Sequence, residues 1–503
     1  MIATTLHQLT HLLYMDDLKL YANTNTDLHG LLDITTEFSK DIGMEFGLDK
    51  CRKLNIEKGK IVRGNYELSA EEAIEAMANE ELYKYLGYNQ GRLVEHSKNL
   101  FKALNTYAVP ILTYSFGIIK WTKTELHTLE IKTRTILTQH RYHHPKSAIE
   151  RIIIPRKEGG RGLIEITQLH KRQIINLKQF FAQKKNSSQL HNAIIEIDKQ
   201  FTSLNLNDEN IEIIDKAGHI QETHNNWKRK ELHGRHYNDL NQTHIDTEAS
   251  NKWLDQTGLF PETEGFLIAI QDQVINTKNY RKYILKDSTL RNDLCKKCHT
   301  KPETIQHITG ACVTLTQNYY THRHNQLVNI IHQKLAIKHK LMQDPYTPYY
   351  KYTPRAVLEN QYYKLYYDRA IITDHTIYNN RPDITFIDKE NKHTYIIDIA
   401  VPNTNNIQKT ISEKIRKYTE LQEEITKIWK MNRVTIVPIV ISTTGVIPKQ
   451  LFNSFNSIDL PKYTYLTLQK AAILNTCRIV RKFLQLESDN NFFTTQHNQL
   501  TQT

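Results

Sequence analysis

The spacing of apolar residues predicts helices over most of the first 290 positions. Between residues 28 and 46, apolar side chains recur every three to four positions, which indicates an amphipathic helix. These side chains are Leu31, Leu32, Ile34, Phe38 and Ile42. The pattern is helical again from about 91 to 190, and the segment 190–290 is polar but keeps a mostly helical pattern.

Near the C-terminus the pattern changes to long apolar runs. Residues 381–388 and 393–402 are separated by the polar turn 389–392, which predicts a β-hairpin. Runs that are apolar at nearly every position are typical of strands buried on both faces. A helix from residue 411 to about 431 and a strand over 434–442 are expected to follow. The inward stripe of this helix is predicted to be Ile411, Ile415, Tyr418, Gln422 and Ile425.

Two acidic residues interrupt the predicted hairpin. Asp383 enters its first strand, and Asp398 lies within the apolar second strand. A carboxylate among isoleucines is costly to bury unless it is paired or bound to a metal. Two such acids on neighbouring strands can chelate one Mg²⁺ or Mn²⁺ and generate a nucleophile for phosphodiester cleavage. For Asp383 alone, a turn residue after Pro382 is the simpler interpretation.

A lysine on the following helix completes this candidate site. At 100° per residue, Lys414 lies within the inward stripe, and Lys417 lies towards its edge. An inward lysine beside two carboxylates can orient the attacking water or stabilise the charge on the phosphate. We therefore predict Lys414 as the third catalytic residue, with Lys417 as the alternative.

The composition is that of a basic chain without a predicted membrane span. The 503 residues carry a formal net charge of +12 and 27 tyrosines, and the length indicates three or so domains. The charge can serve solubility alone. It can also serve polyanion binding, which aromatic side chains support by stacking on bases. No apolar run of about 18 residues is present, so no contact with a membrane is expected.

Three of the five cysteines lie within eighteen residues. Cys295, Cys298 and Cys312, together with His307, offer three thiolates and one imidazole at a spacing typical of structural Zn²⁺ sites. Free cysteines near a surface histidine are the alternative. Lys296 and Lys297 lie in the Cys-x-x-Cys bend, so we predict a zinc knuckle that binds nucleic acid.

Near the N-terminus, two adjacent acids stand between short apolar runs. Residues 11–22 predict a strand, a tight turn with Asp16 and Asp17, and a second strand. Adjacent carboxylates at such a junction are typical ligands of Mg²⁺ beside phosphates. The stretch resembles the Tyr-x-Asp-Asp motif of reverse transcriptases. Segments 43–51 and 84–88 resemble those that follow it in the polymerase palm. This resemblance implies that Lys50 lies near the nucleotide, although a solvated loop lysine is the alternative.

A basic glycine-rich turn lies within the predicted helical region. Residues 156–163 read Arg-Lys-Glu-Gly-Gly-Arg-Gly-Leu. Arg156 and Arg161 could grip a phosphate backbone from such a turn, but a simple surface loop would have the same composition.

The C-terminal site resembles the PD-(D/E)xK restriction-like endonucleases. Ala400 stands where the simplest form of that motif has its lysine. In the endonucleases of site-specific non-LTR retrotransposons the lysine comes from the following helix, which corresponds to Lys414. Arg323 and His324 also resemble a basic motif of that family, which implies contact with nucleic acid.

Four signatures follow one another along the chain: the Asp-Asp hairpin, the thumb-like helical region, the Cys-Cys-His-Cys cluster and the restriction-like site. Their order resembles that of the C-terminal half of the Pol polyprotein of type-1 non-LTR retrotransposable elements. The resemblance implies a multidomain fold of α/β and α parts. The expected parts are a partial reverse-transcriptase palm (1–90), a thumb-like helical region (91–190), a helical linker (191–290), a CCHC zinc knuckle with the basic motif (291–325), a restriction-like α/β endonuclease (326–470) and a C-terminal tail (471–503).

The resemblance also implies a reaction, target-primed reverse transcription. In it, the nuclease nicks target DNA in the nucleus, and the exposed 3′ end primes copying of the element RNA. A further metal-binding Asp of the family lies upstream of the Tyr-x-Asp-Asp motif, so we expect no autonomous polymerase activity from these 503 residues. The alternatives are a non-catalytic relic that binds nucleic acid, and a reading frame that continues upstream of Met1.

Overall fold

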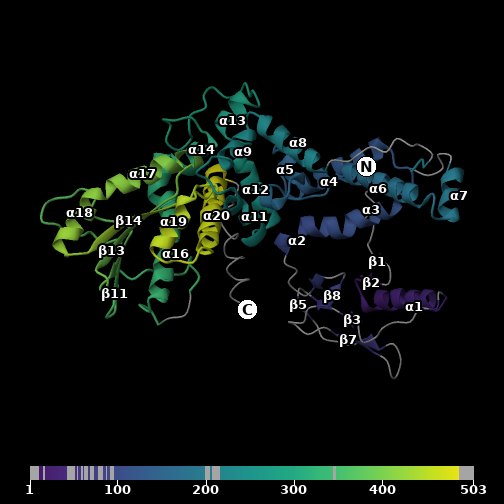
Figure 1. The fold of residues 1–503 in the computed structure, drawn as a ribbon, viewed down its shortest axis with the longest axis horizontal. Coiled ribbons are helices and arrows are strands. Elements are labelled where there is room, and N and C mark those ends of the chain that lie inside the picture. The colour runs from purple at the N-terminus through teal and green to yellow at the C-terminus, as the bar shows by residue number, and fades with distance from the viewer. Residues whose placement is uncertain are drawn as a thin grey trace. The chain divides into compact units, whose positions relative to one another are not determined.

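The computed structural model divides into two compact units, Met1–His96 and Ser97–Thr503. It describes residues 11–14, 17–41, 43, 51–53, 55–57, 60–61, 66–67, 73–76, 83–85, 88–90, 96–198, 204–206, 216–343 and 347–485. Helices and strands occur in both units, so the protein is mixed α/β (Figure 1). Among the described residues, no helix is both long and apolar enough to span a membrane.

The first unit begins with the predicted hairpin. Strand β1 (His11–Tyr14) pairs antiparallel with β2 (Asp17–Leu20), and Tyr14 is opposite Asp17. Helix α1 (Asn25–Asp41) follows. Short strands complete the described part of this unit: β3 (Arg52–Lys53), β4 (Ile56–Glu57), β5 (Lys60–Ile61), β6 (Tyr66–Glu67), β7 (Ala73–Ala76), β8 (Tyr83–Tyr85) and β9 (Tyr88–Gln90).

Helix α1 does not bury the whole stripe that the sequence predicts. Leu32 is buried, whereas Ile34 and Phe38 are 66% and 57% exposed. The helix is thus correctly predicted, but two of its apolar residues point away from the small core that Leu32 shares with Ile74.

The second unit begins with helices, as the apolar spacing predicts. They are α2 (His96–Ala103), η2 (Leu104–Ala108), α3 (Val109–Ser115), α4 (Lys123–Gln139), α5 (Glu150–Ile153), η3 (Arg156–Glu158), α6 (Ile166–Lys184), α7 (Gln189–Ile197), α8 (Lys216–Arg229), α9 (Gly234–Leu240), α10 (Thr247–Asn251), α11 (Trp253–Gln256), α12 (Pro261–Gln271) and α13 (Lys278–Tyr283). A capping box begins α4. The Thr122 hydroxyl accepts from the Glu125 N–H, and the Glu125 carboxylate accepts from the Thr122 N–H, which satisfies two amides that lack helical partners.

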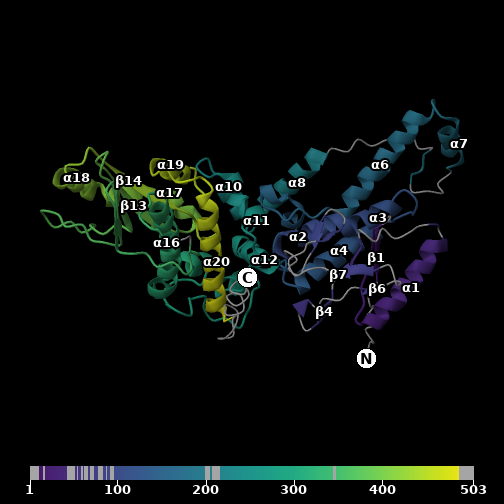
Figure 2. The same cartoon turned by 90° about the horizontal axis from the view of Figure 1, so that it is seen from below.

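Helices of various lengths carry the chain from the cysteine cluster to the C-terminal sheet and around it. They are α14 (Ile305–Gly310), α15 (Val313–Leu315), η4 (Thr316–Tyr320), α16 (Thr321–Lys338), η5 (Thr404–Asn406), α17 (Ile407–Lys417), α18 (Thr419–Ile428), α19 (Gln450–Ser457) and α20 (Thr464–Leu484). The long helix α20 runs beside α16 in both views (Figures 1 and 2).

Five strands form one mixed sheet in the second unit, in the order β10-β11-β12-β13-β14. The strands are β10 (Val357–Glu359), β11 (Tyr363–Tyr367), β12 (Ile384–Asp388), β13 (His393–Ala400) and β14 (Arg433–Val440). The first four are antiparallel, and β12 and β13 form the predicted hairpin. The last pair is parallel, and helices α17 and α18 make the crossover between its strands.

Both faces of β13 are covered, which explains its continuous apolar run. Ile397 and Ile399 belong to a core that includes α16, α19 and α20. Ile396 packs with Tyr418 and other side chains of the crossover helices on the opposite face. Since side chains alternate along a strand, Asp398 shares the face of Ile396 and points towards the crossover helices.

The predicted single helix over 411–431 is two helices. Helix α17 ends at Lys417, Tyr418 lies at the junction, and α18 begins at Thr419. Ile411, Tyr418 and Ile425 are buried as expected, but Ile415 is 42% exposed. The prediction of one continuous stripe is wrong because the chain changes direction at Tyr418.

Candidate functional site

Asp383 and Asp398 meet at one end of the β12–β13 hairpin. Ile384 pairs with Ile397 in this ladder, and extending the register by one residue places Asp383 opposite Asp398. Directly opposite residues of antiparallel strands have Cβ atoms about 4.5–5.5 Å apart. The N–H of Ile399 donates to Asp383 Oδ2 over 2.7 Å. The two carboxylates therefore lie side by side, as the sequence predicts.

The Asp398 carboxylate is buried and held by the crossover helices. Asp398 is 2% exposed, and Lys414 Nζ forms an ion pair with its Oδ2. Lys417 Nζ lies farther away, 3.7 Å from Oδ1. The Tyr418 hydroxyl donates to Oδ1 over 2.5 Å and accepts from Lys417 Nζ over 2.8 Å. The structure thus brings the predicted lysine to the predicted carboxylate.

A histidine from another helix holds the Asp383 carboxylate. His324 Nε2 lies 3.1 Å from Asp383 Oδ2. Burial of the imidazole opposes its protonation, but the Asp383 carboxylate outweighs this effect and raises the pKa of His324 to about 8. Burial likewise raises the pKa of Asp383, but the contact with His324 outweighs it, so that the net shift is downward. In the described structure His324 therefore pairs with a site carboxylate.

These residues offer the donors that a hard divalent cation uses. Two carboxylates supply oxygen ligands, and Mg²⁺ typically combines one or two carboxylates with waters and phosphate oxygens. Both acids already interact with cationic side chains, which balance their charge. The donor set fits Mg²⁺ or Mn²⁺ on chemical grounds.

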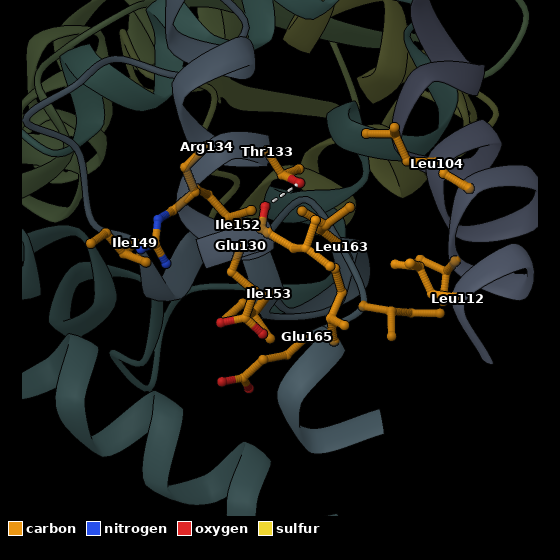
Figure 3. Close-up of a pocket in the computed structure, with 15 residues that line it drawn as sticks. Leu104, Leu112, Glu130, Thr133, Arg134, Ile149, Ile152, Ile153, Leu163 and Glu165 are labelled. Atoms are coloured by element: carbon orange, nitrogen blue, oxygen red, sulfur yellow. Dashed lines mark hydrogen bonds between the residues drawn. The ribbon is translucent and has the colours of Figure 1, made fainter. Parts of the chain in front are cut away.

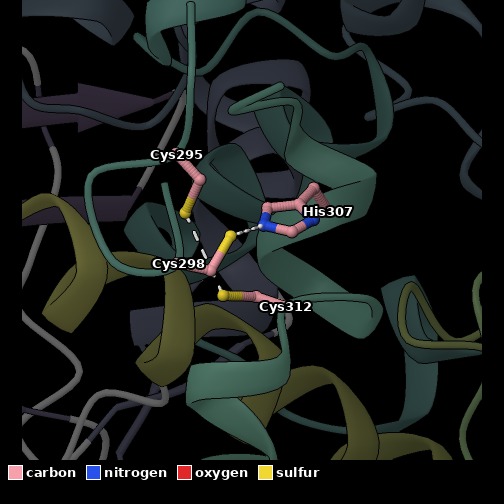
Figure 4. A group of neighbouring side chains, drawn as sticks. All are labelled: Cys295, Cys298, His307 and Cys312. Carbon is pink, nitrogen blue, oxygen red and sulfur yellow. Dashed lines mark hydrogen bonds between the residues drawn. The ribbon is translucent and has the colours of Figure 1, made fainter. Parts of the chain in front are cut away.

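The four predicted ligands of the cysteine cluster come together (Figure 4). Their ligand atoms all lie within 4.8 Å of one another. Cys295 Sγ is 4.0 Å from Cys312 Sγ, and Cys298 Sγ is 3.3 Å from His307 Nε2. Around a tetrahedral zinc, two sulfurs lie about 3.8 Å apart and a sulfur and a nitrogen about 3.6 Å apart. The cluster can therefore hold a metal such as zinc.

Local backbone structure positions these ligands. A turn brings Cys295 N–H to Lys301 O over 2.8 Å, and His307 lies on α14. Burial raises the pKa of Cys295 to about 11. For Cys298, burial also favours the thiol, but hydrogen bonds from Thr300 and neighbouring amides outweigh it and lower the pKa to about 5. Of these two cysteines, Cys298 is therefore the more readily deprotonated to the thiolate.

The two lysines of the Cys-x-x-Cys bend differ in exposure. Lys297 is exposed, whereas Lys296 is half-buried with its Nζ 4.9 Å from the centre of the Phe483 ring on α20. Lys297 is therefore the more accessible of the two for a phosphate group.

Three arginines that the sequence assigned to nucleic acid bind protein groups instead. Arg161 is 1% exposed and pairs with Glu264 at 2.9 Å. Arg156 also pairs with Glu264, at 2.7 Å. Arg323 is 2% exposed and donates to Thr309 O over 2.8 Å. The guanidinium groups of Arg161 and Arg323 are buried with such partners and cannot reach a phosphate backbone, so their predicted contacts are corrected to structural ones. Arg156 is half-buried and is held by its ion pair with Glu264.

The structure describes little of the candidate polymerase residues near the N-terminus. Asp16 and Lys50 lie outside the described residues, and for Asp17 the structure gives only its backbone position in β2. Those three predictions stay predictions.

The sequence did not predict two side chains that contact the carboxylates of the C-terminal site. Tyr418 was assigned only to packing, although it contacts Asp398, and His324 was assigned to nucleic acid, although it contacts Asp383. The sequence signal for Tyr418 is its place in the same helical stripe as Lys414. For His324 no local signal exists, because Asp383 is 59 residues away.

An apolar cavity of about 130 Å³ lies among the helices of residues 104–166 (Figure 3). Leucines and isoleucines line most of it, and Glu130, Arg134 and Glu165 add polar groups. Glu165 already contacts His219 at 2.7 Å, and Glu130 accepts from the Thr167 N–H. Two of the acidic groups that line this cavity are thus already engaged by protein partners.

No known protein-family model matches the chain, and no curated protein sequence matches it.

Proposed function

We propose that the C-terminal sheet carries a divalent-metal-dependent endonuclease that nicks DNA. The observation that carries this proposal is the convergence of Asp383, Asp398 and Lys414 at one end of the β12–β13 hairpin. Asp383 and Asp398 would hold a Mg²⁺ or Mn²⁺ ion, and such an ion would supply Lewis-acid chemistry for the hydrolysis of a phosphodiester.

Each side chain of the site then has a role that follows from its contacts. Asp383 and Asp398 hold the metal, and Lys414, which reaches Asp398 Oδ2, orients the attacking water or the scissile phosphate. Tyr418 fixes the other oxygen of Asp398, and His324 fixes Asp383. Such supporting hydrogen bonds orient metal ligands and tune their basicity.

We further propose that the chain is a C-terminal part of a type-1 non-LTR retrotransposon Pol protein. The order of the Asp-Asp hairpin, the helical region, the Cys-Cys-His-Cys cluster and the nuclease-like sheet supports this descent. In this proposal the cysteine cluster binds structural Zn²⁺, and the protein binds target DNA and element RNA. The reaction is target-primed reverse transcription in the nucleus, and nicking is the step that these residues serve.

The test is a nicking assay with the full chain on supercoiled plasmid DNA, with Mg²⁺, with Mn²⁺ and with a chelator. Wild type is expected to convert supercoiled to open-circular DNA only with a divalent cation, and Asp383→Ala and Asp398→Ala are expected to abolish conversion. Asp388→Ala is the matched control, because Asp388 lies at the other end of β12 and its carboxylate accepts from Asn391 in the adjacent turn. Cleavage by Asp398→Ala at the wild-type rate would refute the proposal.

A non-catalytic role in nucleic-acid binding is the second candidate. The observation that favours it is that Lys414, Lys417 and Tyr418 already surround the Asp398 carboxylate, so that protein groups balance its charge without a metal. Salt-dependent DNA binding without cleavage in either metal would support this candidate.

A further inference from the structure

The helix that carries one metal ligand is bonded to both sides of the nuclease-like site. Helix α14 holds His307 and ends at Gly310. Its penultimate residue, Thr309, is 2% exposed and uses two different groups for contacts outside the helix. The hydroxyl of Thr309 donates to Asn403 Oδ1 over 2.9 Å, and its carbonyl accepts from Arg323 Nη1 over 2.8 Å.

Asn403 is a buried junction between three segments. It is 8% exposed. Its Nδ2 donates to Gln306 O of α14 over 2.9 Å, and its Oδ1 accepts from Thr309 and, over 3.3 Å, from Thr443 after β14. Both polar atoms of the Asn403 side chain therefore have partners in α14, and a buried amide satisfied in this way fixes its neighbours.

Gly310 leaves the space that this junction needs. A Cβ at Gly310 would lie 2.9 Å from Asn403 Oδ1 and 3.1 Å from Asn403 Cγ. The end of α14 and the Asn403 side chain are therefore in direct contact, and a larger residue at position 310 would displace Asn403.

The two connections lead to opposite sides of the candidate site. Asn403 lies between Asp398 and helix α17, and its carbonyl accepts from the Asn406 N–H at the start of that helix. Lys414 follows on α17, about 10 Å along the axis from Ile407 at 1.5 Å per residue. Arg323 directly precedes His324, the partner of Asp383. Thr309 thus bonds to segments that place both Lys414 and His324.

We propose that Asn403 is a positioning residue that couples metal binding in the cysteine cluster to the placement of Lys414. The proposal rests on the endonuclease function for its catalytic consequence. Helix α14 has six residues, and helices this short are not stable by themselves in water. Ligation of His307 would fix α14, and Asn403 would transmit this order to the start of α17. Zinc in the cluster would then support cleavage as well as any contact with nucleic acid.

The test is hydrogen–deuterium exchange of peptides that cover α17 in the full chain, with zinc bound and after its removal by a chelator. In wild type, zinc removal is expected to speed exchange by about tenfold, the effect of losing one or two net hydrogen bonds. In Asn403→Ala, exchange is expected to be fast already with zinc bound and to change less than about twofold on zinc removal. Asn405→Ala, an exposed asparagine two positions along, is the matched control and should behave as wild type.

Two further measurements keep the test decisive. The zinc content of each variant is measured, so that loss of coupling is distinguished from loss of metal. Nicking kinetics for Asn403→Ala should show a lower kcat at an unchanged DNA affinity. If Asn403→Ala does not fold, Gly310→Ala replaces it, because its Cβ displaces Asn403 without removing the amide.

The outcomes separate this proposal from the proposed function. If wild type never nicks DNA, the endonuclease proposal fails, and the exchange data still decide whether the coupling exists. If zinc removal leaves α17 exchange unchanged in wild type, or if Asn403→Ala behaves as Asn405→Ala, the coupling is refuted.

Discussion

Replacing Tyr418 by phenylalanine removes one hydroxyl from the candidate site and leaves its packing in place. The ring is fully buried, and its hydroxyl donates to Asp398 Oδ1 over 2.5 Å. Burial and the nearby Asp398 carboxylate both raise the pKa of Tyr418, so the hydroxyl stays a neutral donor at physiological pH. The same hydroxyl accepts from Lys417 Nζ, which itself lies 3.7 Å from Asp398 Oδ1.

The magnitude follows from the type of bond that is lost. A hydrogen bond to a charged group makes a net contribution to stability of about 1.5–3 kcal/mol. The free energy of unfolding of Tyr418→Phe should therefore be lower than that of wild type by about 2 kcal/mol. Hydrogen bonds that orient metal ligands typically change metal affinity or activity by about 10–100-fold. We therefore expect the Mn²⁺ concentration for half-maximal nicking to rise by at least about tenfold.

Denaturant unfolding and Mn²⁺-dependent nicking measure these two effects. Tyr378→Phe is the matched control. It removes the same hydroxyl from a tyrosine that is 96% exposed, so no buried hydrogen bond is lost. If Tyr418→Phe keeps both the stability and the Mn²⁺ requirement of wild type, the hydroxyl does not hold Asp398, and the geometric account of the site is wrong.

Three other predictions test separate parts of the structure. Lys414→Ala should reduce nicking far more than Lys417→Ala, because Lys414 forms the closer ion pair with Asp398, whereas Lys417 Nζ lies 3.7 Å from its Oδ1; equal losses in single-turnover assays would contradict this order. Burial lowers the pKa of His332 to about 4, below an unfolded value of about 6.5. The unfolded state therefore binds the additional proton, and the contribution of His332 to the free energy of unfolding should fall by about 3 kcal/mol as the pH drops from about 6.5 to about 4. His332→Gln should flatten that slope in unfolding titrations, and an unchanged slope would exclude His332 as its source. Arg161→Met should lower the free energy of unfolding, but by less than the about 3–5 kcal/mol of a fully uncompensated buried charge, because Glu264 keeps Arg156 as a partner, and the salt dependence of DNA binding should not change. Lys297→Ala should instead lower the salt slope by about one, and the reverse result would restore Arg161 as a phosphate contact.

Local chemistry explains which parts of the C-terminal sheet the sequence predicts. Asp398 stands out because a carboxylate within a run of isoleucines needs a partner, and the polar turn 389–392 separates the two strands of the hairpin. Helical spacing then brings Lys414 to the same face. The spacing of Cys295, Cys298, His307 and Cys312 predicts the cluster in the same way, because the ligands lie close in sequence.

Partners distant in sequence explain what the sequence does not predict. Arg161 meets Glu264 across about a hundred positions, so the basic turn looks like an exposed phosphate-binding loop when only its own residues are considered. His324 meets Asp383 across 59 positions. The break between α17 and α18 lies at Tyr418, whose hydroxyl contacts Asp398 20 positions earlier in the chain. Helical spacing carries no information on such contacts.

The central claim is that Asp383, Asp398 and Lys414 form a nuclease site. Its most direct test compares wild type and Asp398→Asn at saturating Mn²⁺, with DNA binding and nicking measured on the same samples. Asparagine keeps the size of the side chain and removes its charge. The account predicts equal DNA binding and a complete loss of nicking in Asp398→Asn, and undiminished nicking by that variant would contradict it.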